Sequence, residues 1–278
     1  MQRSRAPRIA VVVAHPDDEA LWFSSVLNTA AAIVFCYAAV SSRPDWTRGR
    51  QAALEGYPLP AVQSLGLTES EALNGADWND PQEREYGLDV RRRSDTLPGA
   101  DFDRYVDNYP LLVSALRERL KGFDRVYTHN PWGEYGHEEH VQVYRAVRAL
   151  RNELGFELWF GNYCSNKSQR LMLRYIGGFS SRYDVCETDA ALGERLAVHY
   201  RANGCWTWFD DYRWFTHECF MSDAALPTPK PMGHMFPLNY IKIPEPAPEP
   251  SRAARAAGTL RSALAEIKRV AGAGASGR

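Results

Sequence analysis

Two short segments of the sequence concentrate side chains that bind metal ions or move protons. The first, His15-Pro16-Asp17-Asp18-Glu19, places an imidazole and a carboxylate three residues apart. Across a tight turn, these two groups can converge on one metal ion. Asp17 would then stand beside the ion without binding it, as a base for metal-activated water must. The acids can also cap the helix that follows, but capping gives no reason for the histidine before them.

The second segment, residues 127–141, contains two glycines and two further histidines. His137 and His140 are three residues apart at the start of an expected helix, so they share one of its faces. Gly133 and Gly136 let the backbone turn tightly ahead of them. A histidine pair alone is weak evidence, but beside the first segment it supplies a third ligand. Two imidazoles and one carboxylate leave positions open for water and substrate, which is typical of a catalytic metal site.

The expected secondary structure brings both segments to one edge of a sheet. Apolar runs without alternation predict buried strands at Arg8–Ala14, Ile33–Val40, Phe123–His129 and Phe156–Tyr163, and helices are expected from Asp18, over Asn108–Lys121 and over Glu138–Leu154. This alternation predicts a doubly wound α/β fold, with a mostly parallel sheet. Ligands of such sheets bind beyond the carboxyl ends of the strands. Both segments follow such ends.

Composition narrows the function classes. Lys and Arg total 33 against 34 Asp and Glu, a net charge of −1, which argues against a nucleic-acid partner. The five cysteines are scattered without metal-ligand or redox spacing, which favours a reduced, cytoplasmic setting. The uncharged stretch Ala20–Val40 is long enough to span a bilayer. Polar residues in its middle, and its division into a helix and a strand, favour a buried core instead.

Two parts of the chain depart from the α/β pattern. Residues 74–103 are polar and charged, with interspersed glycines and prolines. This composition predicts an inserted loop, which either acts as a lid or binding segment or is merely solvated. Arg91 begins a run of three arginines that can grip a phosphate, unless the run is simply solvated. The domain is expected to span residues 1–245, followed at 246–278 by a proline-rich linker and a basic amphipathic tail. The tail either contacts a membrane surface or a partner protein, or remains in solvent.

In combination, the two motifs resemble the PIG-L/LmbE-like de-N-acetylase family. The resemblance covers roughly Arg8–Ile243 and implies a Rossmann-like sheet with helices on both faces. It also implies a zinc ion, with iron(II) as the alternative. This chain has Glu138-Glu139 between its paired histidines, where many members have Pro-Asp, and neither position is a ligand.

The resemblance also assigns roles to single residues. It implies three zinc ligands, His15, Asp18 and His140. Asp17 would be the general base, and His137 would protonate or polarise the reacting group. Tyr135 would help to hold the oxyanion. As additional substrate contacts we expect Trp132, whose ring can stack on a sugar, and Arg91.

The expected activity is therefore metal-dependent hydrolysis of an amide, with metal-activated water as the nucleophile. The substrate would be an N-acetylated amino sugar or its conjugate, and the protein would be cytoplasmic, or peripherally bound to a membrane through its tail. One alternative is an amidase of the same fold that removes a larger acyl group or acts on a thiol conjugate. A second is a catalytically silent sugar-binding module.

Overall fold

A central sheet organises the chain in the computed structural model, which describes residues 5–175, 183–223 and 238–244. The strands lie in the order β3 (Val62–Thr68), β2 (Ala32–Ala39), β1 (Ile9–Val13), β6 (Arg125–Thr128), β7 (Glu157–Gly161), β10 (His217–Ser222) and β9 (Tyr183–Glu187). The five strands from β3 to β7 pair in parallel, and β10 runs antiparallel to both of its neighbours. The predicted, mostly parallel sheet is confirmed.

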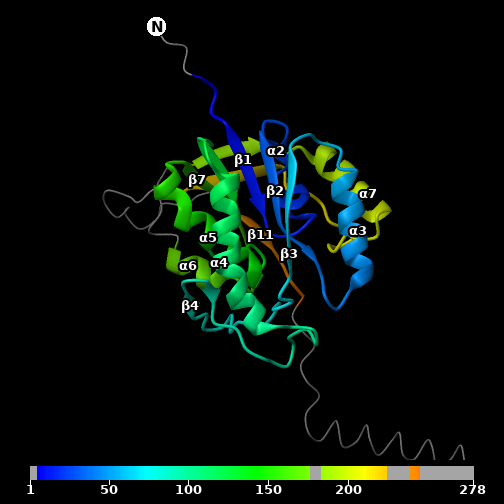
Figure 1. Cartoon of the computed structure of the whole chain (residues 1–278), viewed down its shortest axis with the longest axis vertical. Helices are drawn as coiled ribbons and strands as arrows, with labels where there is room; N and C mark the ends of the chain where they lie inside the picture. Colours follow the sequence, from blue (N-terminus) through cyan, green and yellow to red (C-terminus); the bar gives the residue numbers. More distant parts are fainter. Residues whose placement is uncertain (1–4, 176–182, 224–237, 245–278) are drawn as a thin grey trace, which may run out of the picture. The chain divides into compact units, whose positions relative to one another are not determined.

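Helices cover both faces of this sheet (Figure 1). One face packs against α4 (Phe102–Arg119), α5 (Glu138–Leu154) and α6 (Gln169–Tyr175). The other packs against α1 (Asp18–Trp22), α2 (Ser24–Leu27), α3 (Pro44–Glu55) and α7 (Ala190–Ala202). In β1, Val12 points into the first core and Val13 into the second, so both faces of the strand are buried. The fold is therefore doubly wound, as predicted.

The stretch Ala20–Val40 forms α1, α2 and β2. The single helix expected from Asp18 is interrupted at Phe23, because the buried Glu218 carboxylate accepts hydrogen bonds from the backbone N–H groups of Ser24 and Ser25 and from their hydroxyls. Glu218 lies on β10, far along the chain, which is why the sequence did not reveal this break. No helix in the described part of the chain is long and apolar enough to cross a membrane.

Residues 74–103 are more structured than a free loop. They contain an antiparallel pair, β4 (Glu83–Arg84) and β5 (Gly87–Leu88), and a bridge between Ala76 and Val90. The Glu138 carboxylate accepts hydrogen bonds from the Ala76 N–H and the Trp78 indole, which ties the segment to α5. A second small parallel pair joins β8 (Tyr163–Ser165) to β11 (Asn239–Ile241). The segment therefore has a fixed place beside the sheet's carboxyl edge.

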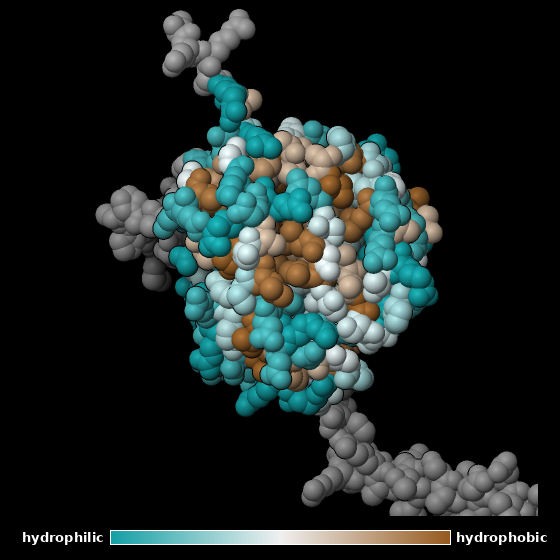
Figure 2. Space-filling model, in the orientation of Figure 1, coloured by the Kyte–Doolittle hydropathy of each residue, from teal (hydrophilic) through white to brown (hydrophobic). Residues whose placement is uncertain are grey.

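The sheet and its helices belong to one compact unit, which ends at Ile243. The proposed tail at 246–278 lies outside the described residues, so its helix and its contacts remain predictions. In the compact unit, hydrophilic residues dominate the face shown in Figure 2, with hydrophobic residues grouped near its middle. All five cysteines are free thiols.

Candidate metal centre

The two histidine-containing segments meet at the switch point of the sheet. The first follows β1 and the second follows β6, and these strands are neighbours. From β1 the chain builds β2 and β3 on one side, then returns to place β6 and β7 on the other. The connections thus diverge at the carboxyl ends of β1 and β6, where open α/β sheets bind their ligands. The topology therefore places the two segments at the sheet edge at which the sequence predicted them.

The turn after β1 contains a strained backbone conformation at Asp17. Asp17 has φ of 110°, a left-handed conformation that side-chain-bearing residues rarely adopt and that typically costs about 1–3 kcal/mol. Its N–H donates to Glu19 Oε2 at 3.1 Å. The other Glu19 oxygen accepts hydrogen bonds from the hydroxyls of Tyr57 and Tyr200, each at 2.7 Å. Glu19, which is fully buried, therefore fixes the turn rather than facing the site.

Three side chains converge at this turn with atoms able to bind a cation. The Nδ1 atom of His15 lies 3.3 Å from Asp18 Oδ2, and the Nε2 atom of His140 lies 3.3 Å from Asp18 Oδ1. The two imidazole rings are 5.4 Å apart between centroids. All three residues are buried, with at most 5% of their surface exposed. The structure thus brings together the three residues that the resemblance implied as ligands.

The outer sides of both imidazoles are held by buried carboxylates. His15 Nε2 donates to Glu139 Oε2 at 2.8 Å, and His140 Nδ1 donates to Glu134 Oε2 at 2.8 Å. These bonds leave the lone pairs of His15 Nδ1 and His140 Nε2 facing Asp18. His140 Nε2 is buried and makes no hydrogen bond. Two imidazole nitrogens and one carboxylate, with outer carboxylates behind the rings, fit a divalent ion such as zinc.

The surroundings of these ligands favour positive charge. Burial lowers the pKa of His15, but Glu69, Asp18 and Glu139 outweigh it and leave the pKa well above its ordinary value. Burial likewise opposes the charged form of His140, while Asp18 and Glu134 raise its pKa to about 9. A cluster of buried carboxylates that stabilises cationic imidazoles will also stabilise a metal cation at the same place.

Two more histidines lie within ligand distance of this cluster, but their lone pairs are used elsewhere. The N–H of Ala14 donates to His129 Nε2 at 2.8 Å, which occupies the nitrogen nearest Asp18. The N–H of Glu139 donates to His137 Nδ1 at 3.2 Å, so the neutral ring carries its proton on Nε2. Burial, reinforced by His140 and His15, places the pKa of His137 well below its ordinary value. His137 is therefore arranged as a hydrogen-bond donor.

A third cluster of possible ligands, His15, Glu69 and Glu139, lies on the far side of the His15 ring. Here the carboxylates already have partners. Glu69 forms an ion pair with the buried Arg50 guanidinium. Glu139 Oε1 accepts hydrogen bonds from the backbone N–H and the hydroxyl of Ser70 at 2.6 and 2.7 Å. These acids support the His15 ring and are not arranged as an open metal site.

Asp17 stands next to the three converging side chains, and 2% of it is exposed. Its Oδ2 accepts hydrogen bonds from the Thr207 N–H at 2.9 Å and the Thr207 hydroxyl at 2.6 Å. Burial, together with the charge of Asp18, raises the pKa of Asp17 to about 7. A carboxylate with this proton affinity can accept and return a proton near neutral pH.

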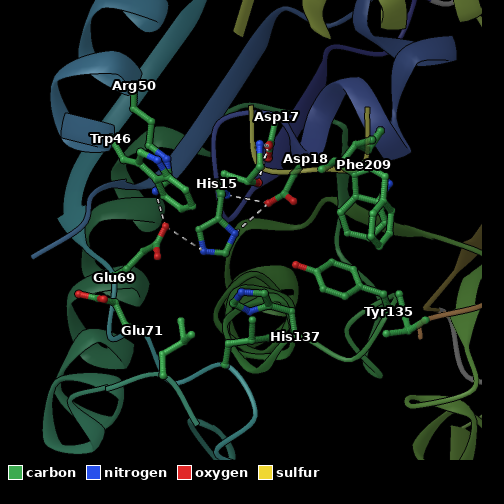
Figure 3. Close-up of a pocket in the computed structure, with 16 residues that line it drawn as sticks. His15, Asp17, Asp18, Trp46, Arg50, Glu69, Glu71, Tyr135, His137 and Phe209 are labelled. Atoms are coloured by element: carbon green, nitrogen blue, oxygen red, sulfur yellow. Dashed lines mark hydrogen bonds and ion pairs between the residues drawn. The ribbon is translucent and has the colours of Figure 1, made fainter. Parts of the chain in front are cut away.

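A cavity of about 370 Å³ opens over these side chains. His15, Asp17, Asp18 and His137 line it, with the Tyr135 hydroxyl directed between Asp18 and His137 (Figure 3). Its remaining walls are apolar or charged, and include Trp46, Arg50, Glu69, Glu71, Leu97, Trp208 and Phe209. The cavity is of the size that holds a small organic ligand. The candidate acid–base groups thus face a space in which a substrate can bind.

The structure corrects the expected role of Trp132. This side chain has no exposed surface, packs edge-on against Phe160 and donates from Nε1 to the Tyr163 carbonyl at 2.6 Å. It belongs to the hydrophobic core and does not line the cavity, so it cannot stack on a substrate. Arg91 is exposed and is not among the residues that line the cavity, so the structure gives its substrate contact no support.

Replacing Trp132 by phenylalanine should therefore change stability and not substrate binding. Loss of the indole hydrogen bond and of ring volume should lower the free energy of unfolding by about 1–3 kcal/mol, measured in urea. KM should stay unchanged. The matched variant Trp208→Phe alters a cavity wall and should change KM. A raised KM with unaltered stability in Trp132→Phe would reverse this correction.

Two residues that shape the site had no sequence signal. Glu134 lies within the second motif, but its spacing to His140 does not indicate that its carboxylate reaches behind the His140 ring. Thr207 lies 190 residues from the Asp17 that it holds. The sequence shows that Thr207 lies in an aromatic-rich stretch, but it does not show which way these side chains face.

No protein-family model matches the chain. Among curated proteins it is similar to a 1D-myo-inositol 2-acetamido-2-deoxy-alpha-D-glucopyranoside deacetylase of Mycolicibacterium smegmatis, 29% identical over 177 residues, which are 56% of this chain and 58% of the relative. The protein of the same name from Corynebacterium kroppenstedtii is 29% identical over 169 residues, 51% of this chain and 40% of the relative. The chain thus covers about half the length of these relatives.

Among solved structures, the zinc-inhibited form of the teicoplanin deacetylase Orf2 aligns with a TM-score of 0.49 and 16% identity, over 79% of this chain and 99% of that one. The N,N'-diacetylchitobiose deacetylase of Pyrococcus horikoshii aligns with a TM-score of 0.38 and 12% identity, over 74% and 72%. The curated deacetylases bear out the resemblance indicated by the two motifs: the chain is similar in sequence to deacetylases of an acetamido sugar.

Proposed function

We propose that this chain is a metal-dependent de-N-acetylase that hydrolyses the amide of an N-acetylated amino sugar or amino-sugar conjugate. The observation that carries the proposal is the convergence of His15 Nδ1 and His140 Nε2 on the Asp18 carboxylate, at the floor of a cavity. The similarity to curated deacetylases of an acetamido sugar supports the choice of reaction.

His15, Asp18 and His140 would hold the ion, with zinc as the first choice for this donor set and iron(II) as the second. A divalent ion bound there supplies a Lewis acid that activates water and polarises the amide carbonyl. Glu139 and Glu134 orient the two imidazoles from behind. A binding module without catalysis would not need the acid–base groups that surround these ligands.

The remaining groups divide the proton chemistry between them. Asp17 is the base that takes a proton from the attacking water, and Thr207 holds its carboxylate in place. His137, with its proton on Nε2, donates toward the amide as the tetrahedral centre forms and collapses. The Tyr135 hydroxyl is a second donor toward the developing oxyanion, and such a donor typically contributes about 3–4 kcal/mol. The C–N bond then breaks as the proton that Asp17 took from the water passes to the amine nitrogen, so that the amine leaves protonated and acetate remains.

We extend the proposal to the carrier of the substrate and to the cellular setting. The names of the curated relatives make N-acetylglucosamine linked to inositol the first conjugate to try. A cytoplasmic protein, with membrane or protein contact through residues 246–278, remains our prediction. Liposome binding by the full chain, compared with a chain ending at Pro244, tests the membrane contact.

An acetate-release screen with zinc supplied tests the activity. We expect release from N-acetylglucosamine or one of its conjugates, and slow or no reaction with amides of bulkier acyl groups, because the acid–base groups lie at the buried floor of the cavity. Preference for a bulky acyl group or a thiol conjugate would replace this proposal with an amidase of the same fold. A purified protein that neither contains nor takes up a divalent metal would favour a sugar-binding module.

A further inference from the structure

A single buried carboxylate connects two histidines behind the candidate metal centre. Glu134 Oε2 lies 3.0 Å from His129 Nδ1 and 2.8 Å from His140 Nδ1. Its other oxygen accepts a hydrogen bond from the Asn130 N–H at 2.8 Å. The two imidazole rings stack with centroids 3.8 Å apart. Glu134, His129 and His140 have no exposed surface, so water cannot replace any of these bonds.

The hydrogen bonds determine which nitrogen of each ring carries the proton. His129 Nε2 accepts from the Ala14 N–H, so the His129 proton is on Nδ1 and points to Glu134. The carboxylate cannot donate, so the proton of His140 is also on Nδ1. When the His140 ring is neutral, as a metal ligand must be, this arrangement leaves the lone pair on Nε2, directed at Asp18. An ionised Glu134 is what makes His140 able to bind a metal through that atom.

We propose that Glu134 is a positioning residue that, with His129 stacked behind His140, locks His140 in its metal-binding tautomer and orientation. This inference rests on the metal site proposed above, and adds two residues to which the resemblance assigns no role. His129 contributes from the end of β6, where its bond to Ala14 anchors the assembly to β1. The assembly thereby joins the ends of β1 and β6, the two strands that precede the ligand segments.

The backbone of Glu134 supports this role. Its φ of 48° is left-handed, a conformation in which glycine is the easiest residue. Its N–H donates to Asn130 Oδ1 at 3.0 Å, and its carbonyl accepts from the Ser168 hydroxyl at 2.5 Å. Local structure alone would therefore favour glycine at this position. A glutamate here is explained by what its carboxylate does for the two imidazoles.

Glu134→Gln tests the proposal, because glutamine keeps the volume of the side chain but brings an N–H₂ group to the imidazoles. If the amide donates to His140 Nδ1, the ring proton must move to Nε2, where it blocks the ligand lone pair. We expect zinc affinity, measured by competition with a chromophoric chelator, to fall by about 10–100-fold. In the metal-free variant, ¹⁵N NMR of the imidazoles should show His140 with a proton on Nε2 and none on Nδ1.

The matched control is Glu138→Gln. Glu138 is equally buried and lies at the start of α5, the helix that carries His140, but its carboxylate holds Ala76 and Trp78, away from the ligands. Its zinc affinity should match that of the unaltered protein. An equal loss of affinity in both variants would overturn the proposal, because it would reflect a general weakening of α5. Unchanged affinity in Glu134→Gln would overturn it as well.

Two further measurements keep the test decisive. If Glu134→Gln does not fold, ¹⁵N NMR of the unaltered zinc-loaded protein still reports the tautomer of His140, and a bound His140 ring without a proton on Nδ1 would contradict the proposal. Zinc binding by the unaltered protein distinguishes a failure of the proposed function from a failure of the role proposed for Glu134. Its failure removes the proposed function, whereas normal binding with an insensitive Glu134→Gln removes only the role of Glu134.

Discussion

Replacing Asp17 by asparagine is expected to abolish amide hydrolysis while leaving the metal bound. Asparagine has nearly the same shape and can still accept the Thr207 hydrogen bonds, but it cannot take a proton from water. Because general-base catalysis contributes about 10²–10⁴-fold, kcat should fall by at least that range. The comparison needs two measurements on one preparation, the rate of acetate release and the zinc content.

The matched control for this variant is Glu71→Gln. Glu71 also lines the cavity, but both of its oxygens accept hydrogen bonds from Ser42. Its amide form should retain most of the activity. Substantial hydrolysis by Asp17→Asn would refute the assignment of the base. Loss of zinc from that variant would show instead that Asp17 belongs to the metal-binding set.

Replacing His140 by alanine is expected to remove the metal, and the activity with it. Deletion of the ring takes away one of three ligands and leaves the buried Asp18 and Glu134 carboxylates each with one imidazole partner fewer. The loss of zinc affinity should exceed the roughly 10–100-fold effect that is usual for an outer hydrogen-bond partner. Equilibrium dialysis followed by elemental analysis of the protein measures it.

His199→Ala provides the comparison for that loss. His199 lies on α7, where its Nε2 contacts the Ala53 carbonyl, and it takes no part in the candidate centre. This variant should keep its zinc and its activity. If His140→Ala retained zinc at full affinity, the ion would have to be held by other residues, and the ligand set proposed here would be wrong.

The sequence was sufficient to predict where the candidate centre lies. The apolar runs that become β1 and β6 are buried on both faces, and their lack of alternation is visible without a structure. Once both runs are assigned to one parallel sheet, His15 and His140 must lie at its carboxyl edge. The spacing of His15 and Asp18 needed only a tight turn. Periodicity and motif spacing are sufficient to predict local features of this kind.

The supporting residues could not be predicted, because their roles depend on geometry that no local pattern encodes. Glu134 reaches the His140 ring only through a left-handed turn at its own backbone. Thr207 meets Asp17 only after α7 has packed beside α1. Trp132 was misassigned for the converse reason. It adjoins the catalytic motif in sequence, but the turn directs its ring into the core.

The identity of the bound ion and its ligands can be tested directly by crystallography of the zinc-loaded protein, with anomalous diffraction measured at the zinc edge. We predict one strong peak among His15 Nδ1, the Asp18 carboxylate and His140 Nε2, next to Asp17 and open to the cavity. A peak coordinated by His129 or Glu69 in place of these ligands would contradict the proposed centre. So would a protein that takes up no zinc there at all.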